Sequence, residues 1–441
     1  MPPSLSLWSS AARIAAQTPA SRNRYVDFLR ALSIVVVISG HWLVAAPYVV
    51  GGEITLNSML AYEEWTQILS WLLQVMPVFF FVGGYSNSVS WQAAMRDQRP
   101  YADWLIGRLQ RLAAPVLPLL VVWTLLGIGL YLADVGSGIV TVGSRMSLIP
   151  IWFLAVYIGV TVFTPLTFAA WRRFGMAPFW IFAALAAIND VLFFAIDLTS
   201  TSWFNYAFVW LAVHQLGYAW RAGRLPTDWK ALLWSASALA ILIVLVTLGP
   251  HPFSMVSVPG AGVSNSSPPK LPLLLLGLVQ IGLVLSLETP ARRWLERPRP
   301  WTATVLVNSM IMTIYLWHRT ASVIVIGLAI LLGNLGLTLE PGSGTWWLAR
   351  VPWFAAYLIA LTALALIFGT FERSAVRHPP PSAWRQVAGA VLICSGLSFL
   401  ALKGIGADNW LGVRWFGVLL PLAGALLAGV NPLPRSKQTR S

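Results

Sequence analysis

The sequence contains a series of apolar segments, each long enough to cross a lipid bilayer. A spanning helix needs about 20 mostly apolar residues, and charged residues make up only 10% of this 441-residue chain. Soluble domains carry about 25% charged residues, so a chain this poor in charge cannot cover a water-soluble globule. The pattern predicts an all-α, polytopic transmembrane helix bundle. Twelve segments are expected, near residues 27–49, 67–91, 112–133, 148–170, 177–197, 203–220, 231–249, 271–288, 303–332, 347–371, 386–402 and 411–430.

Lys and Arg residues gather in alternate loops between these segments. Placing the N-terminus in the cytoplasm puts most of the 29 Lys and Arg residues in inner loops, as the positive-inside rule requires. We therefore expect a multi-pass protein of the cell membrane with both termini in the cytoplasm. This topology also accounts for the net charge of +14. Nucleic-acid binding is not expected, because the chain has no long basic surface segment interleaved with aromatic residues.

Three parts of the chain are distinguished by composition. Residues 1–24 lack the apolar core of a signal peptide and are interpreted as a cytoplasmic tail. Residues 25–375 form the transmembrane core, and residues 376–441 hold the last two segments and a basic cytoplasmic tail. Among the outer loops, 51–65 is acidic, whereas 249–270 is rich in Gly, Pro and Ser. The latter is either a flexible connector or a functional loop.

The first apolar segment carries ionisable residues that lipid disfavours. Arg30 and His41 are eleven residues apart. At about 100° per residue this is about 20° more than three full turns, so both lie on one helix face, roughly 16 Å apart along the axis. Asp27 precedes Arg30 by about one turn on the same face. Arg30 can snorkel to the interface, whereas His41 lies deeper, where an imidazole that exchanges a proton near neutral pH suits a general base.

These residues carry a resemblance to a known family. Arg30 and His41, with ten residues between them, match the Arg-x10-His signature of the acyltransferase type 3 family of membrane proteins. The surrounding sequence VDFLRALSIVVVISGHW is similar to the opening helix of that family. The resemblance covers roughly residues 25–375. It is closest to actinobacterial members, and we expect this chain to be one without the fused esterase-like domain that many members carry.

Further stretches resemble the family in the same order along the chain. MPVFFFVGGYSNS (76–88) resembles its second-helix pattern of aromatic residues before a small-residue turn. RLQR (108–111) is similar to its Arg-x-x-Arg motif at the start of the third helix. IWFLAVY (151–157) and YLWH (315–318) resemble later segments.

The resemblance implies an enzyme with a ten-helix core. Such enzymes transfer acyl groups, commonly acetyl from acetyl-CoA, to hydroxyl groups of extracytoplasmic sugars, glycolipids, peptidoglycan or secreted metabolites. The expected partners are therefore acyl-CoA, an extracytoplasmic hydroxyl acceptor and the lipid bilayer, and no bound cofactor is expected. The last two segments of the chain are additions to the ten-helix core.

The resemblance also gives the polar residues roles. His41 either acts as a general base on the acceptor hydroxyl or accepts the acyl group itself. Arg30 either orients the donor or pairs with Asp27 to hold the start of the helix. Arg108 and Arg111 lie one turn apart, where their guanidinium groups can bind the phosphates of CoA. Positive-inside anchoring also explains two arginines at that place.

Four more polar residues fall within apolar segments. His318 and Arg319 lie in the ninth segment, where an Arg costs at least about 2.5 kcal/mol, so we expect the pair to line a cavity. Asp190 either binds the acceptor or makes a hydrogen bond to a neighbouring helix. His214 is interpreted mainly as a structural residue that can also line the cavity.

Other function classes find less support in the sequence. No metal site is expected, because the five histidines are scattered without His-x3-His or His-Glu-x-x-His spacing. The single cysteine, Cys394, excludes an intrachain disulfide and is expected to pack between helices. A transporter or flippase of an envelope precursor is the alternative, because polar residues at membrane depth also mark transport pathways. A non-catalytic scaffold would leave the buried charges unexplained.

Overall fold

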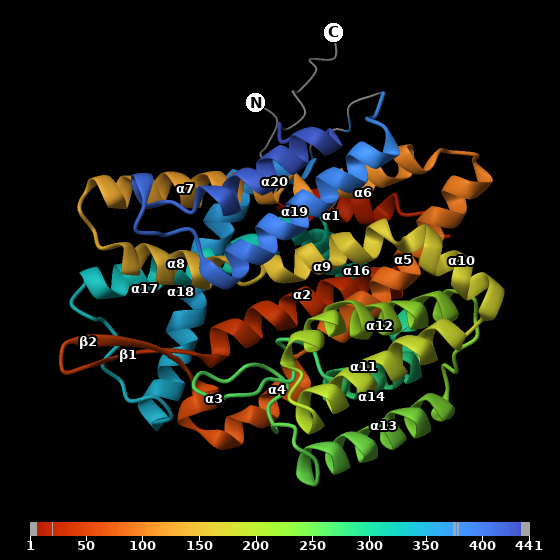
Figure 1. The fold of residues 1–441 in the computed structure, drawn as a ribbon, viewed down its shortest axis with the longest axis horizontal. Coiled ribbons are helices and arrows are strands. Elements are labelled where there is room, and N and C mark those ends of the chain that lie inside the picture. The colour runs from red at the N-terminus through yellow and green to blue at the C-terminus, as the bar shows by residue number, and fades with distance from the viewer. Residues whose placement is uncertain (1–6, 20, 374–375, 377–378, 434–441) are drawn as a thin grey trace. The chain divides into compact units, whose positions relative to one another are not determined.

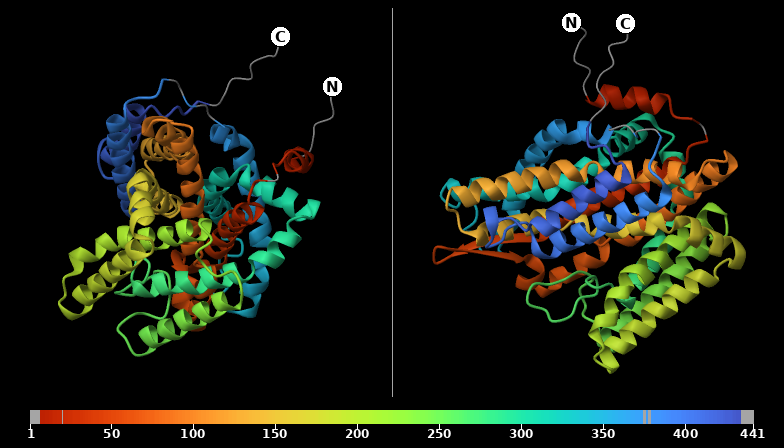
Figure 2. Two further views of the ribbon diagram at one scale, coloured as in Figure 1. Left: turned by 90° about the vertical axis from the view of Figure 1, so that its right-hand side faces the viewer. Right: turned by 45° about the horizontal axis from the view of Figure 1, so that its top comes forward.

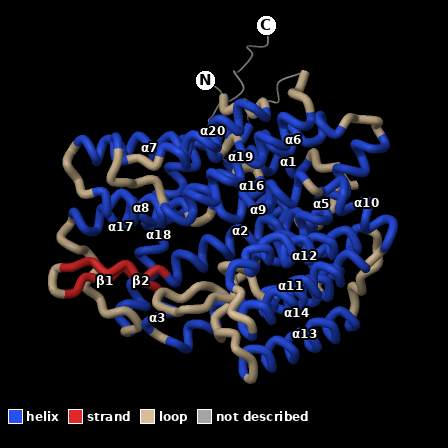
Figure 3. Tube along the Cα trace, viewed as in Figure 1, coloured by secondary structure: helices blue, strands red, loops and turns tan. Residues whose placement is uncertain are grey.

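The computed structural model describes residues 7–19, 21–373, 376 and 379–433. This part of the chain is mostly helical, and β1 and β2 are the only strands within it (Figure 3). The predicted all-α helix bundle is confirmed. Contacts between Cα atoms group the chain into two units. Unit 1 takes residues 1–90, 164–311 and 340–344, and unit 2 takes residues 91–163, 312–339 and 345–441.

Unit 1 contains the strand pair β1–β2 and helices from two separate stretches of the chain, 1–90 and 164–311. Most of these elements are labelled in Figure 1. Its elements in chain order are α1 (Leu7–Ala16), α2 (Arg24–Val44), β1 (Ala45–Val50), β2 (Glu53–Ser58), α3 (Met59–Tyr62), η1 (Glu64–Ile68), α4 (Leu69–Leu73), most of α5 (Met76–Arg96), α10 (Thr164–Phe174), α11 (Ala177–Ala195), η2 (Thr199–Phe204), α12 (Asn205–Arg221), α13 (Trp229–Thr247), α14 (Leu271–Ser286), α15 (Glu288–Trp294) and α16 (Pro298–Asn308). Within it, α11 packs on α12 and α13 on α14.

Among its described residues, unit 2 contains helices joined by loops and no named strand. Its elements in chain order are α6 (Tyr101–Ala113), α7 (Val116–Leu132), α8 (Ser137–Leu148), α9 (Ile151–Val162), α17 (Ile311–Leu331), α18 (Gly344–Phe368), η3 (Gly369–Arg373), α19 (Ala383–Lys403), η4 (Trp410–Gly412) and α20 (Trp415–Ala428). The last two helices are the blue pair of Figure 2; they run side by side, and α19 also packs on α9.

The spans are less uniform than the sequence predicts. Every one of the twelve predicted segments contains a helix. In the described chain, eight helical segments are long and apolar enough to cross a membrane, or ten if the bent pairs α8–α9 and α14–α15 each form one span. The helices α12 and α20 are shorter, with 17 and 14 residues. The ninth predicted segment is interrupted at Ser309 and Met310, between α16 and α17.

The first membrane helix, α2, ends earlier than the predicted segment 27–49. Helix α2 ends at Val44, and β1 pairs antiparallel with β2. Gly51 and Gly52 join the strands with φ angles of 60° and 86°, and two positive φ angles are what a two-residue type I′ turn requires. Part of the predicted first span and the first half of the predicted acidic loop thus form a hairpin.

Two glycines bring α5 and α12 into direct backbone contact. A Cβ atom on Gly217 would lie 2.6 Å from Tyr85 N and 2.7 Å from Gly84 Cα, and one on Gly84 would collide with the carbonyl oxygen of His214. Small residues at such crossings are typical of helix packing in membranes. The small-residue turn expected in this stretch is wrong, because α5 continues as a helix to Arg96.

The Gly-, Pro- and Ser-rich loop (249–270) is packed, in contrast to the flexible connector considered above. Asn265 Nδ2 donates a hydrogen bond to the carbonyl oxygen of Pro252 at 2.6 Å. Met255 N donates to Ser70 Oγ at 2.8 Å, and the Met255 side chain is buried. Side-chain to backbone hydrogen bonds thus hold a loop whose composition favours no helix or strand.

Candidate functional site

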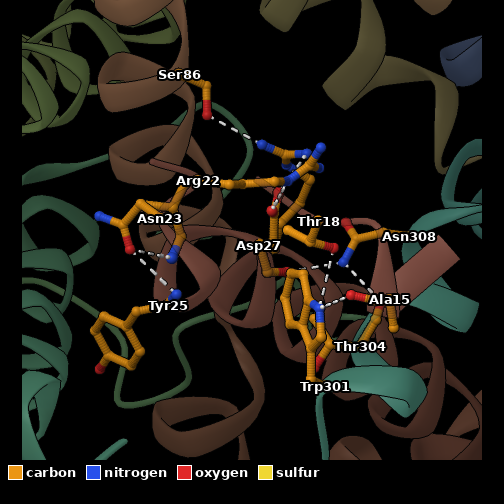
Figure 4. A network of polar contacts seen from close by, with 12 residues as sticks. Ala15, Thr18, Arg22, Asn23, Tyr25, Asp27, Ser86, Trp301, Thr304 and Asn308 are labelled. Atoms are coloured by element: carbon orange, nitrogen blue, oxygen red, sulfur yellow. Dashed lines mark hydrogen bonds and ion pairs between the residues drawn. The ribbon is translucent and has the colours of Figure 1, made fainter. Parts of the chain in front are cut away.

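Asp27, at the start of α2, forms ion pairs with two arginines, Arg22 and Arg30. Figure 4 shows Asp27 beside Arg22. Its Oδ2 is 2.5 Å from Arg22 Nε, whereas its Oδ1 is 3.5 Å from Arg30 Nη1. Because a short charge-assisted hydrogen bond is stronger than an ion pair at 3.5 Å, Asp27 pairs mainly with Arg22. The hydrogen bond raises the pKa of Arg22 above its ordinary value, against the opposing effect of burial. Two cations share one carboxylate, so the cluster carries surplus positive charge.

Asn23 fixes the first turn of α2. Its Oδ1 accepts hydrogen bonds from Tyr25 N at 3.1 Å and Val26 N at 3.4 Å, which satisfies backbone groups that a helix start leaves unpaired. Its Nδ2 donates to the hydroxyl oxygen of Tyr85 on α5 at 3.0 Å. The same residue therefore begins α2 and ties it to α5.

Helix α5 also holds Arg30. The Arg30 Nη2 atom donates a hydrogen bond to Ser86 Oγ at 3.0 Å. Among the described residues, Ser86 and Asp27 supply the hydrogen bond and the ion pair of Arg30, whose side chain is 26% exposed. A guanidinium group has five N–H donors. Arg30 is thus oriented by two contacts while further donors remain available to an anion.

Helices α16 and α1 support this cluster. Asn308 Nδ2 donates to the backbone oxygen of Asp27 at 2.9 Å. Trp301 Nε1 donates to the backbone oxygen of Ala15 at 3.3 Å and to Thr18 Oγ1 at 3.2 Å (Figure 4). Because both donors belong to α16, that helix fixes α2 and the segment that precedes it.

His41 lies in the last turn of α2 and is partly buried. The helix is continuous from Arg24 to Val44, so Arg30 and His41 occupy one face with roughly 16 Å between them along the axis. Helix α4 packs closely beside this end, because a Cβ atom on Gly40 would lie 3.3 Å from Leu73 Cβ. The charged cluster and the imidazole thus stand at opposite ends of one rigid element.

Arg108 and Arg111 lie in the second half of α6, in unit 2. The Arg108 guanidinium lies over the Trp104 ring, 5.8 Å from its centroid. Arg111 is exposed and interacts electrostatically with the carboxylate of Glu372. At the start of α17, Glu372 accepts hydrogen bonds from Met312 N and from Thr313 N, each at 3.1 Å. Both arginines therefore have partners that orient them.

His318 and Arg319 are buried in α17. His318 Nδ1 donates to the carbonyl oxygen of Tyr315 at 2.6 Å, which leaves Nε2 as its second polar atom. Arg319 Nε donates to the carbonyl oxygen of Met146 on α8 at 3.2 Å. Their predicted place along a cavity stays a prediction.

Arg350 of α18 is a second buried guanidinium in unit 2. It lies 3.9 Å from the centroid of the Trp346 ring and 5.6 Å from that of Trp353. Aromatic faces stabilise a cation that has left water. Tyr357 interacts electrostatically with both Arg350 and Arg319.

Asp190 and His214 are buried in unit 1 and bonded to neighbouring helices. Asp190 accepts hydrogen bonds from Asn205 Nδ2 at 3.2 Å and from Leu271 N at 2.7 Å, so it joins α11 to α12 and to the start of α14. His214 Nε2 lies 3.2 Å from Asn87 Nδ2 of α5. The contacts of Asp190 are hydrogen bonds to neighbouring helices, one of the two roles considered for it. The contact of His214 fits a structural role. Contact of either residue with a substrate stays a prediction.

A buried cation accompanies Asp190. The Lys270 ammonium lies 3.5 Å from the centroid of the Phe193 ring. Burial, followed by the charge of Lys270, lowers the pKa of His251 to about 4. His251 is therefore neutral at pH 7, and its approach to Asp190 at 3.7 Å is not an ion pair under those conditions.

Comparison with known protein families agrees with the sequence motifs. A family model described as an acyltransferase domain matches residues 23–370. The chain belongs to the acyltransferase type 3 family. The resemblance predicted over residues 25–375 is thereby confirmed. No curated protein and no solved structure matches the chain.

This acyltransferase is a multi-pass membrane protein, and membership of the family sets aside the scaffold interpretation. The matched region contains every candidate residue, from Asp27 to Arg319. It ends before α19 and α20. The two last helices are thus additions to the family region, as the sequence indicates.

Sequence reasoning missed the partners of the predicted residues. Arg22 and Ser86 contact the charged residues of α2, and Asn308 holds its backbone. Arg22 falls within residues 1–24, which the sequence predicts only to be a cytoplasmic tail, and Ser86 falls within the family-like stretch 76–88. A contact between Arg30 and Ser86, 56 residues apart, leaves no periodic signal in one sequence.

No metal site is found among the residues that the structure describes, where no cluster of three or more His, Cys, Asp or Glu side chains occurs. Cys394 lies within α19, and its Sγ contacts the carbonyl oxygen of Ala155 on α9 at 3.1 Å. This position agrees with the packing role expected from the sequence.

Proposed function

We propose that this acyltransferase moves an acyl group, commonly acetyl, from cytoplasmic acyl-CoA to a hydroxyl group of an envelope glycan, a glycolipid or a secreted metabolite. The observation that carries the proposal is the arrangement of α2, with a surplus-positive cluster at one end and His41 at the other. Clustered Lys and Arg residues orient the Arg30 end toward the cytoplasm. The donor then enters at Arg30 and the acceptor approaches from the opposite side.

The donor is a polyanion, and its phosphates need cationic partners. Arg30 keeps donors available beside Ser86 and Asp27. Arg108 and Arg111 add two further guanidinium groups, which bind phosphate oxygens in pairs. In this proposal Arg30 orients the donor, and Arg108 and Arg111 bind its phosphates.

His41 supplies the chemistry in this proposal. It takes the proton of the acceptor hydroxyl as that oxygen attacks the thioester carbonyl carbon. The carbon–sulfur bond then breaks, and the proton returns from His41 to the CoA sulfur. The products are an ester and free CoA, so protons and electrons balance without a further reactant.

The function is tested with the purified acyltransferase and labelled acetyl-CoA. Label should pass into the lipid or glycan fraction of an envelope extract, with one CoA thiol released per group transferred. A protein that releases no CoA with any extract, but moves a solute across the bilayer of proteoliposomes, would instead be a transporter.

Arg22→Gln should weaken donor binding although Arg22 need not touch the donor. Without Arg22, the Asp27 carboxylate can turn fully to Arg30 and cancel its charge. The KM for acyl-CoA should rise by about three- to ten-fold, the size of one ordinary hydrogen bond. Initial rates at varied acyl-CoA concentration measure this change.

Two further variants isolate the competition for Asp27. In the Arg22→Gln background, Asp27→Asn should return the KM toward the wild-type value, because no carboxylate then competes for Arg30. Arg13→Gln, on the exposed face of α1, removes an equal charge from the same tail and should leave the KM unchanged. A wild-type KM in Arg22→Gln would show that Asp27 does not tune Arg30.

A further inference from the structure

The C-terminal segment is hydrogen-bonded near both ends of α6, through α19 and through Asn431, which follows α20. At one end, Gln386 Nε2 of α19 donates to the backbone oxygen of Ala102 at 3.1 Å. At the other, Gln110 Nε2 donates to the backbone oxygen of Asn431 at 2.6 Å, and Asn431 N donates to Gln110 Oε1 at 2.8 Å. Both glutamine side chains are buried. Three hydrogen bonds therefore join α6 to a part of the chain outside the matched family region.

The two helices of this segment, α19 and α20, pack against each other as one hairpin. A Cβ atom on Gly389 would lie 2.5 Å from the backbone oxygen of Gly424, and one on Gly424 would lie 2.5 Å from the backbone oxygen of Gly389. A Cβ atom on Gly396 would collide with the ring of Pro421. Such close packing of small residues is typical of tightly associated membrane helices. The start of α19 and the end of α20 lie together, so the hairpin meets α6 as a unit.

The position of Gln110 gives these bonds a consequence for the arginines. Gln110 stands between Arg108 and Arg111 in the sequence. At about 100° per residue it points about 100° away from Arg111 and about 200° away from Arg108. Gln110 is buried against the C-terminal segment, whereas Arg108 is partly exposed and Arg111 is exposed. The bonds of Gln110 thus fix the rotation of α6 about its axis, and with it the directions of both arginines.

We propose that the α19–α20 hairpin is a positioning element for the donor-binding helix, and that Gln110 and Gln386 are its positioning residues. The proposal rests on the donor role given above to Arg108 and Arg111. Helix α6 has 13 residues, and Ala114 and Pro115 separate it from α7 within one apolar span, Tyr101–Leu132. The hairpin holds α6 at two points from outside the matched family region.

Gln110→Met tests the proposal, because methionine keeps the length of the side chain and removes both hydrogen bonds to Asn431. The KM for acyl-CoA should rise by about three- to ten-fold, while the KM for the acceptor stays unchanged. Gln386→Met should raise the same constant, since it releases the other end of α6. Gln98→Met, an exposed residue in the loop before α6, is the matched control and should leave it unchanged.

Arg108→Gln and Arg111→Gln separate this proposal from the proposed function. If neither raises the KM for acyl-CoA, the donor role of the arginines fails. If they raise it but Gln110→Met and Gln386→Met do not, the positioning role of the hairpin is overturned. A purely structural role would lower the thermal midpoint and the yield of folded protein without moving the KM, and that result would also overturn the proposal.

Discussion

Replacing His41 with alanine should lower the kcat/KM of acyl transfer by about 10²- to 10⁴-fold, the usual contribution of a positioned general base. The acceptor hydroxyl is not nucleophilic until its proton has a destination, and the imidazole is the group that α2 presents at the end remote from Arg30. The loss should fall on kcat rather than on the KM for acyl-CoA, because His41 acts in the transition state. Labelled acetyl transfer in detergent-solubilised protein measures it.

Leu32→Ala is the matched control on the same helix. Leu32 is exposed on α2 two residues after Arg30, about 200° away from it, so its truncation should leave kcat near the wild-type value. Folded His41→Ala protein that retains wild-type activity would exclude His41 from the chemistry. Label bound covalently to wild-type protein in the absence of acceptor, and lost in the variant, would instead identify His41 as the acyl carrier.

The fold could be predicted wherever local pattern decides it. Each apolar run of spanning length contains a helix in the described chain, because lipid allows hardly any backbone structure except a helix with its bonds satisfied internally. The breaks in those segments were less visible. The hairpin at 45–58 begins within the predicted first span, since Tyr48, Val49 and Val50 suit a strand and are also apolar enough to extend a membrane helix.

The site could be predicted where its residues share one helix. Arg30 and His41 lie on a common face because α2 is continuous, and the spacing alone gives this. The pairing of Asp27 could not be predicted in the same way. Its spacing from Arg30 suggests an i,i+3 ion pair, yet Arg22 from the preceding segment is closer, at 2.5 Å against 3.5 Å. Competition between two cations depends on tertiary geometry that one sequence does not contain.

Gly217→Leu should disrupt the packing that brings Ser86 to Arg30. A side chain at Gly217 meets the backbone of α5, at Tyr85 N and Gly84 Cα, and backbone atoms cannot rotate aside as a flexible side chain would. One extra methylene in a packed core costs about 1–3 kcal/mol, and leucine adds several carbons, so most of the protein should fail to fold. The thermal midpoint and the monodisperse fraction in size-exclusion chromatography measure the loss.

Gly217→Ala and Gly129→Ala turn this expectation into a graded test. The alanine variant at Gly217 should fold less stably by roughly 1–3 kcal/mol, and its surviving fraction should show a raised KM for acyl-CoA because α5 carries Ser86 away from Arg30. Gly129 is an exposed helical position of α7 with open space around it. There alanine should be neutral or stabilise by up to about 1 kcal/mol. Equal stability of the two alanine variants would mean that α5 and α12 do not depend on backbone contact at Gly217.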